Sequence, residues 1–203
     1  MKPKLTRVAS VAIGIGFMTA ACGSSGTPAL SPAPSHSVAV GSPAKAPAGT
    51  FGTACAEIPA NGMGSFSGMA QAPVATAAAN SPLLSDLGRA VQAAGLAATL
   101  NSAKAITVFA PDNKAFAALG SGNVNTLMAS KSDLKKVLEY HIVNGRITPA
   151  DLASGAPLTS LLGTAIHPQK TGDGYAINNA EVVCGNIQTA NATVYIVDKL
   201  LIP

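Results

Sequence analysis

The amino-acid sequence predicts an α+β fold, because helix-forming segments fill the first half of its folded part and short β-rich runs fill the second half. In the first half, apolar residues recur every three or four positions behind residues that favour helix starts. In the second half, Gly and Asn residues separate short runs rich in Val, Ile, Tyr and Thr. Helices first and hairpins later indicate an α+β domain.

The N-terminus has the layout of a secretory signal. A basic segment, residues 1–7, precedes an uncharged and mostly apolar run, residues 8–21, which ends in small residues directly before Cys22. A transmembrane helix needs about 20 apolar residues to cross the hydrocarbon core. The run is shorter than that, and a polar stretch rich in Gly, Ser and Pro follows it. We therefore expect residues 1–21 to be a signal peptide.

The charge of the mature chain argues against nucleic acid as a partner. Without the signal peptide's Lys2, Lys4 and Arg7, ten basic residues remain against nine acidic ones. No stripe of Lys and Arg residues provides the electrostatic footprint that a phosphate backbone requires.

A low-complexity linker follows the signal peptide. Residues 22–53 consist mainly of Ser, Pro, Ala, Gly and Thr, and Lys45 is their only charged residue. Such a segment buries too little apolar surface to offset its ordering entropy, so we expect it to be disordered. Its prolines favour extended conformations, which suit a spacer that holds a domain away from a membrane. The folded domain is then predicted to span residues 54–203.

Start and stop signals delimit the helices of this domain. Ser81 and Pro82 suit the cap and the first position of a helix that ends at Gly95. Asp112 or Asn113 can cap a further helix, which places Phe116 and Leu119 inward. Ser132 precedes another helix, and Thr148 opens a short one. The expected strands or β-rich runs are residues 106–110, 142–143, 158–167, 175–177, 181–184, 187–189 and 193–197. Turns are expected at Gly163, residues 172–174, 178–179 and 185–186.

The cysteines are consistent with an exported domain. If Cys22 is lipidated, Cys55 and Cys184 remain, near the start and the end of the domain. Disulfides persist outside the cytoplasm, so the simplest interpretation is a bridge between these two residues. Two buried free thiols are the alternative.

Three landmarks resemble the fasciclin family. Residues 107–116, which read TVFAPDNKAF, resemble its first signature, and residues 191–203 resemble the second. Between them, Tyr140 and His141 stand where fasciclin domains have a Tyr-His motif. The resemblance covers roughly residues 68–203. It implies a single fasciclin-type β-wedge with helices packed along it, and roles in adhesion or host recognition rather than catalysis.

A closer resemblance is to the mycobacterial fasciclin antigens, which include a secreted protein and a glycosylated surface lipoprotein. It rests on residues 68–71, 74–78, 183–185 and 189–195. In addition, residues 19–22, which read TAAC, resemble the bacterial lipobox, although Thr19 stands where the pattern prefers Leu. This resemblance implies lipidation of Cys22, with simple secretion as the alternative.

The sequence offers little for catalysis or metal binding. Of the three histidines, His36 lies in the linker, and a zinc site at His141 or His167 would lack ligands if the cysteines are bridged. No Gly-x-Ser-x-Gly elbow occurs, and the carboxylates are few and scattered. We therefore predict that the chain is not an enzyme and binds no cofactor or metal.

Two polar motifs have both a functional and a structural interpretation. Tyr140 and His141 are a possible adhesion motif, because relatives have been discussed as presenting it to receptors. His141 also continues the apolar face of Leu134, Val137 and Leu138, which favours a hydrogen-bonded core histidine. Residues 191–193 match a glycosylation sequon inside the closing strand signature, where a structural role is favoured.

The function expected from these features is that of a cell-surface lipoprotein mediating adhesion or contact with host or extracellular matrix. The expected partner is a host or matrix protein or an envelope component, and the expected location is the extracytoplasmic membrane face, with release from the cell as a further outcome. We expect a monomer. The alternative is a binder of a lipid or small apolar ligand in a crevice between wedge and helices, which a sizeable apolar pocket would favour.

Overall fold

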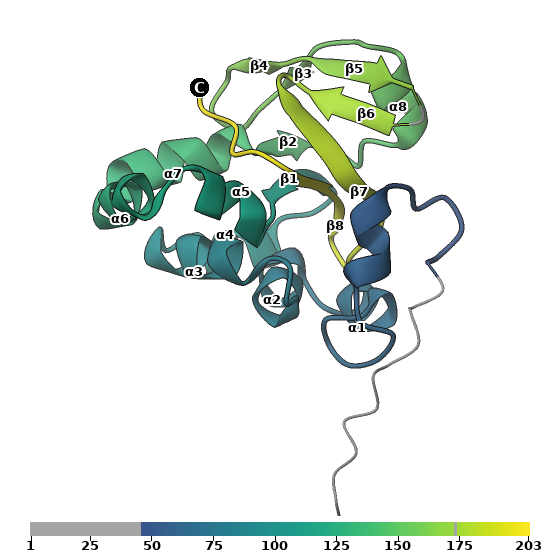
Figure 1. Ribbon diagram of the computed structural model, residues 1–203, viewed down its shortest axis with the longest axis horizontal. Helices are drawn as coiled ribbons and strands as arrows, with labels where there is room; N and C mark the ends of the chain where they lie inside the picture. The colour runs from purple at the N-terminus through teal and green to yellow at the C-terminus, as the bar shows by residue number, and fades with distance from the viewer. Residues whose placement is uncertain (1–45, 173) are drawn as a thin grey trace, which may run out of the picture. The chain divides into compact units, whose positions relative to one another are not determined.

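The computed structural model describes residues 46–172 and 174–203, and in them it confirms the α+β fold class (Figure 1). The helices are η1 (Thr53–Glu57), α1 (Phe66–Gln71), α2 (Val74–Asn80), α3 (Ser85–Ala93), α4 (Ala97–Ser102), α5 (Asn113–Ala118), α6 (Ser121–Ala129), α7 (Lys131–Tyr140) and α8 (Pro149–Ala153). The strands are β1 (Ile106–Pro111), β2 (Ile142–Asn144), β3 (Leu158–Thr159), β4 (Ala165–Ile166), β5 (Pro168–Thr171), β6 (Gly174–Ile177), β7 (Ala180–Gln188) and β8 (Ala192–Val197).

The main sheet has six strands in the order β2-β1-β8-β7-β6-β5. Its central pair, β1 and β8, is parallel, and the other neighbouring strands are antiparallel. Every residue of β1 and β8 is buried, as expected for strands covered on both faces. These two strands carry the two segments that resemble the fasciclin signatures, so both signatures lie side by side at the centre of the fold.

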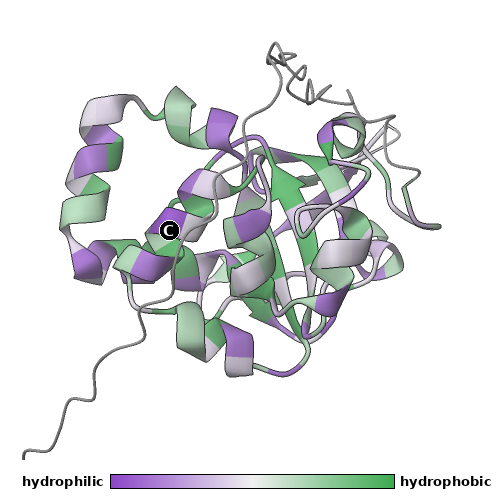
Figure 2. Ribbon diagram, turned by 90° about the horizontal axis from the view of Figure 1, so that it is seen from below, coloured by the Kyte–Doolittle hydropathy of each residue, from purple (hydrophilic) through white to green (hydrophobic). Residues whose placement is uncertain are grey.

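Each face of the sheet has its own apolar core. Val108, Ala110, Val194 and Ile196 face the helical layer formed mainly by α1–α4 and α7. On the other face, Phe109 and Tyr195 join a smaller cluster with residues of α8 and the β4–β6 region. In Figure 2 the central strands are largely green, between helices that mix green and purple. This is the alternation that a sheet between two packed layers requires.

The predicted start of the helix after Ser81 is wrong. The helix α3 begins at Ser85, and the buried hydroxyl of Ser81 has no hydrogen-bond partner. The cap comes from Asn113, whose side-chain oxygen accepts from the amide of Asp86 at 3.1 Å while its NH₂ group donates to the carbonyl of Pro82. A local cap was therefore unnecessary, because a distant side chain satisfies the same backbone groups.

The other helix boundaries lie close to the predicted ones. Gly95, with φ +73°, ends α3 in a Schellman arrangement, in which Leu96 N–H donates to the carbonyl of Val91. Thr148 forms a capping box at the start of α8, as its sequence context predicts. The helix expected after Ser132 begins two positions earlier, at the first residue of α7.

The turn predicted at Gly185 and Asn186 is also wrong. Both residues lie inside β7, where the register with β8 shifts and Asn186 adopts φ +59°. A β-bulge accommodates residues with positive φ, as a turn does. Gly185 and Asn186 therefore do not distinguish a bulge from a turn. Beyond the predicted elements, the fold contains β5 and the helices η1, α1, α2, α4 and α6.

Candidate functional site

The Tyr-His motif lies at the end of α7 and is buried. Tyr140 is 5% exposed and His141 is 1% exposed. The imidazole Nδ1 of His141 donates to the carbonyl of Val137 at 2.7 Å, and its Nε2 accepts from the amide of Leu201 at 3.0 Å. Both ring nitrogens are therefore used inside the domain, and the histidine joins α7 to the C-terminal tail.

The pKa of His141 agrees with a neutral imidazole that is hydrogen-bonded at both nitrogens. Burial away from water lowers its pKa from 6.5 to about 4, although the hydrogen bond to Val137 opposes the shift. The imidazole therefore stays uncharged at neutral pH. With one nitrogen donating and the other accepting, no lone pair remains free for a metal ion.

Tyr140 connects the same helix to the second half of the sheet. Its hydroxyl donates to the carbonyl of Ala165 in β4 at 3.3 Å and accepts from the side-chain NH₂ of Asn178 at 2.9 Å. Asn178 has φ +54° and forms the turn between β6 and β7, as predicted for the Asn178–Asn179 pair. The motif as a whole therefore holds α7, the β3–β4 hairpin and the tail together.

A disulfide joins Cys55 to Cys184, across 129 positions of sequence. It links the short helix η1 to β7. Next to it, Phe51 and Gly185 form an antiparallel bridge, with Gly185 N–H donating to the carbonyl of Phe51 at 2.7 Å. Ordered structure therefore extends into the last residues of the segment that we predicted to be linker.

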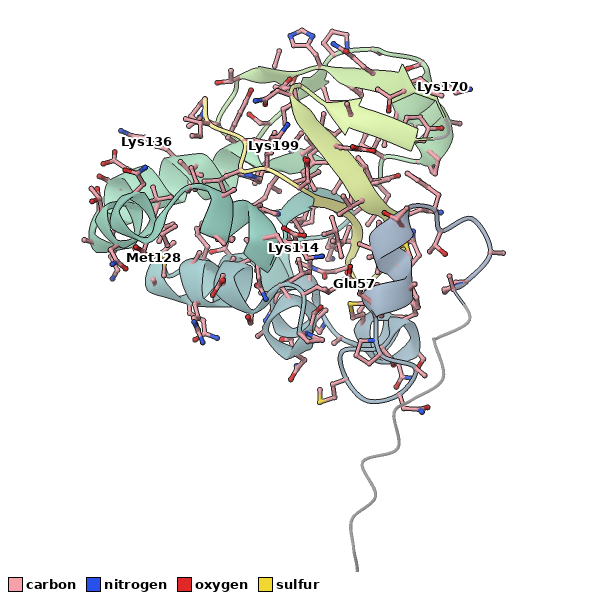
Figure 3. All side chains as sticks on the ribbon, in the orientation of Figure 1. Glu57, Lys114, Met128, Lys136, Lys170 and Lys199 are labelled. Carbon is pink, nitrogen blue, oxygen red and sulfur yellow. A yellow bond between two sulfur atoms is a disulfide. The ribbon has the colours of Figure 1, made fainter. Side chains whose placement is uncertain are left out.

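The ring of Phe51 packs directly against the backbone at Gly185. A Cβ at Gly185 would overlap this ring. The ring also lies 5.1 Å from that of Tyr175 and 6.2 Å from that of Tyr195, measured between centroids. We call residues 49–57 the strap, because they fasten the N-terminal side of the domain to the bulge of β7. Figure 3 shows Glu57 at the end of the strap next to Lys114 of α5, with Nζ and Oε1 3.0 Å apart.

The sequon residue Asn191 is bonded to three backbone groups. Its NH₂ group donates to the carbonyls of Leu100 and Ala103, at 2.7 and 2.8 Å, and its oxygen accepts from the amide of Val74 at 2.9 Å. These contacts join α2 and α4 to the turn before β8. The side chain thus has the structural role that its place in the strand signature favoured.

The crevice between helices and sheet is almost full. A cavity of about 20 Å³ lies between α2, α3, α7 and the strands β1 and β8, with His141 and Thr189 as its only polar lining residues. This is room for roughly one water molecule. A lipid would need far more space, so the structure gives the lipid-binding alternative no support in this crevice.

Within residues 46–172 and 174–203, no three His, Cys, Asp or Glu side chains gather in a way that could hold a metal ion. In the same part of the chain, none of the helices is both long and apolar enough to span a membrane. Cys22, the predicted lipidation site, lies outside the described residues.

None of the exposed apolar side chains stands out in the sequence. Among the described residues, the large ones are Met63, Leu161 and Ile202, which are 58%, 41% and 65% exposed. No sequence signal separates them from buried residues of the same types, since Leu and Ile are ordinary core residues.

The fold and the contacts of its polar side chains define the class of protein. It is an α+β domain in which a sheet lies between a helical layer and a second apolar cluster, and its notable polar side chains, His141, Tyr140 and Asn191, all bond within the fold. Comparisons with known proteins then identify the family. The profile of the Fasciclin domain matches residues 82–203, and the chain belongs to the fasciclin family, as its two signatures predicted.

Comparison with individual proteins identifies a narrower group within the fasciclin family. The chain is 39% identical over 209 residues to the cell surface glycolipoprotein MPB83 of Mycobacterium bovis, which covers 95% of the chain and 92% of the relative. It is 40% identical over 174 residues to the immunogenic protein MPB70 of the same species, covering 82% and 88%. The predicted closeness to mycobacterial fasciclin antigens is therefore confirmed.

The fold has a solved counterpart in an insect. A FAS1 domain pair from the cell adhesion molecule Fasciclin I superposes with a TM-score of 0.58 at 17% identity. The match covers 67% of this chain and 52% of that structure, so the chain spans about half its length. At this identity the likeness concerns the fold alone.

Proposed function

We propose that the chain is an adhesion module held at the outer face of the cell membrane by a lipid on Cys22. The observation that carries the proposal is the internal use of the polar motifs, which leaves the outer surface as the place for function. The similarity to a protein named a cell surface glycolipoprotein supports the location. The proposed partner is a host or extracellular-matrix protein, with an envelope component as the other candidate.

The strap supports the tethered arrangement. The linker reaches the domain where Phe51 bridges β7 and Cys55 is bonded to Cys184. A force applied through the linker would therefore act on the sheet at β7 as well as on the helix η1. A domain that works on the end of a tether benefits from such a double connection.

The anchor is tested by fractionation. Replacing Cys22 by Ala should release the protein from the membrane fraction into the medium, because the acyl chains that retain it would have no attachment site. The measurement is an immunoblot of both fractions. An unchanged distribution would contradict the lipid anchor.

Adhesion is tested separately. The full-length chain, purified in mild detergent and immobilised on beads, should bind decellularised fibroblast matrix or envelope extract above the level of uncoated beads. Failure to bind either material would contradict the adhesion proposal, whatever the fractionation result.

A further inference from the structure

The sequence contains two Asn–Gly pairs, Asn61–Gly62 and Asn144–Gly145. In such a pair the backbone nitrogen of the glycine can attack the side-chain carbon Cγ of the asparagine. Glycine favours this attack, because it has no Cβ to obstruct the approach and leaves the backbone free to turn. Asparagine is for this reason one of the thermolabile residues. The fold then decides which of the two pairs can react.

Exposure and space do not distinguish the two pairs. Asn61 lies in the loop between η1 and α1, Asn144 is the last residue of β2, and both are exposed. Gly62 and Gly145 have similar backbone angles, φ +89° and φ +92°, and a Cβ at either position would meet no atom within 4 Å. Water reaches both asparagines, and neither glycine is crowded.

The second pair is held by the sheet. Gly145 N–H donates to the carbonyl of Ala105 at 2.7 Å, and Asn144 is paired with Ile106 of β1. The nitrogen that attacks in this reaction is therefore already engaged, and its peptide group cannot turn unless the end of the β1–β2 pair opens first. Such local opening costs free energy, which slows any reaction that requires it.

The first pair is not held in this way. Among the hydrogen bonds of residues 46–172 and 174–203, none involves the N–H of Gly62 or the carbonyl of Asn61. These two groups form the peptide bond between the residues, so this peptide group can turn without breaking a hydrogen bond. Only the far side of Gly62 is fixed, where its carbonyl accepts from the amide and the hydroxyl of Ser65 at 3.1 and 2.6 Å.

We propose that Asn61 is a site of spontaneous deamidation in the folded protein and that the fold protects Asn144. The nitrogen of Gly62 forms a bond to Cγ of Asn61, the bond from Cγ to Nδ2 breaks, and the proton of the attacking nitrogen leaves with the departing ammonia. Water then opens the five-membered succinimide ring at one of its two carbonyl groups. Opening at one carbonyl gives aspartate, and opening at the other gives isoaspartate, in which the main chain runs through the side-chain carbons.

The modification changes both charge and structure. The chain without its predicted signal peptide has ten basic and nine acidic residues, so one added carboxylate removes its formal excess of positive charge. In the isoaspartate form, the backbone before Gly62 also gains a carbon atom. The carbonyl of Gly62 binds Ser65, which is the N-cap of α1 and accepts from the amide of Gly68. The longer backbone therefore disturbs the residues that start α1.

Peptide mass mapping of the full-length chain tests the proposal. The chain is purified in mild detergent, incubated at body temperature in mildly alkaline buffer and digested at intervals. The peptide with Asn61 should gain the mass difference between an acid and an amide at least about tenfold faster than the peptide with Asn144, because the second reaction requires local opening. Isoelectric focusing should show a more acidic form that appears at the same rate.

Two controls separate the fold from the local sequence. In guanidinium chloride with a reducing agent, the two peptides should react at similar rates, because both Asn–Gly pairs are then free of the sheet. Asn61→Gln should suppress the acidic form of the folded chain, because a glutamine side chain closes a larger ring much more slowly. This variant keeps an exposed amide at the same position, and it should unfold at the same temperature as the unaltered chain.

The rates in the folded chain decide the outcome. Equal rates at the two sites, a faster reaction at Asn144, or no reaction at Asn61 would overturn the proposal. A tenfold difference that persists in guanidinium chloride would also overturn it, because the neighbouring residues rather than the fold would then set the rates. An acidic form that appears unchanged in Asn61→Gln would place the reaction elsewhere. None of these results depends on the proposed adhesion.

Discussion

Replacing His141 by Ala should lower the free energy of unfolding by about 3 kcal/mol. The change leaves the amide of Leu201, which is 1% exposed, without an acceptor, and a buried unpaired group costs about 1–3 kcal/mol. It also frees the carbonyl of Val137 and enlarges the cavity of about 20 Å³ that His141 already lines. Lost packing adds to the cost.

Urea unfolding at neutral pH, followed by circular dichroism, measures this effect. The control is His167→Ala, which removes an exposed histidine and should change stability by less than about 0.5 kcal/mol. A similarly small effect of His141→Ala would refute the structural role. So would a loss of matrix binding by His141→Ala that exceeds its unfolded fraction, because His141 would then contact the partner directly.

The same histidine makes stability depend on pH. Its pKa is about 4 in the folded state and 6.5 in the unfolded state, so the unfolded chain binds more protons between these values. The stabilising contribution is therefore complete above pH 6.5 and is lost as the pH falls towards 4, by roughly 3 kcal/mol in all. The stability difference between the unaltered chain and His141→Ala should shrink over this range. A constant difference would contradict a buried neutral imidazole.

Three further predictions concern the framework of the domain. Replacing Cys55 and Cys184 by Ser should lower the free energy of unfolding by about 4–5 kcal/mol, the chain-entropy value for a loop of this length; mass mapping of unreduced protein that recovers two free thiols would contradict the bridge. Asn191→Ala should cost about 2 kcal/mol in urea unfolding, because it leaves three backbone groups unpaired, and a loss under about 0.5 kcal/mol would argue against this. Gly185→Ala and Phe51→Ala should be coupled by roughly 1 kcal/mol in a double-mutant cycle, since a Cβ at Gly185 overlaps the Phe51 ring; strictly additive effects would contradict the contact.

The parts of the fold that the sequence predicts are those with local signals. Asp112 caps α5 by accepting from the amide of Ala115 at 2.6 Å, and Thr148 caps α8. In both cases the cap lies beside the helix that it starts, so its residue type is informative. The continuous apolar runs of β1 and β8 likewise indicate buried strands.

The parts that it mispredicts depend on distant partners. The start of α3 is set by Asn113, and the bulge of β7 is occupied by Phe51 from the strap. Neither partner can be paired with its target before the fold is known. The helix α2 was missed for another reason: five of its seven residues are alanine or threonine, which give only a weak apolar pattern to detect.

In the candidate site, too, some features can be predicted from the sequence and others cannot. Tyr140 and His141 stand out in the sequence because their polar groups need specific partners, and the structure provides these partners inside the domain. Leu161 and Ile202 do not stand out, because an exposed aliphatic residue has the same composition signal as a buried one. A motif that folding requires is therefore easier to recognise in a sequence than an exposed apolar residue. The Tyr-His motif can be recognised because Tyr140 and His141 connect α7 to β4, to the turn before β7 and to the C-terminal tail.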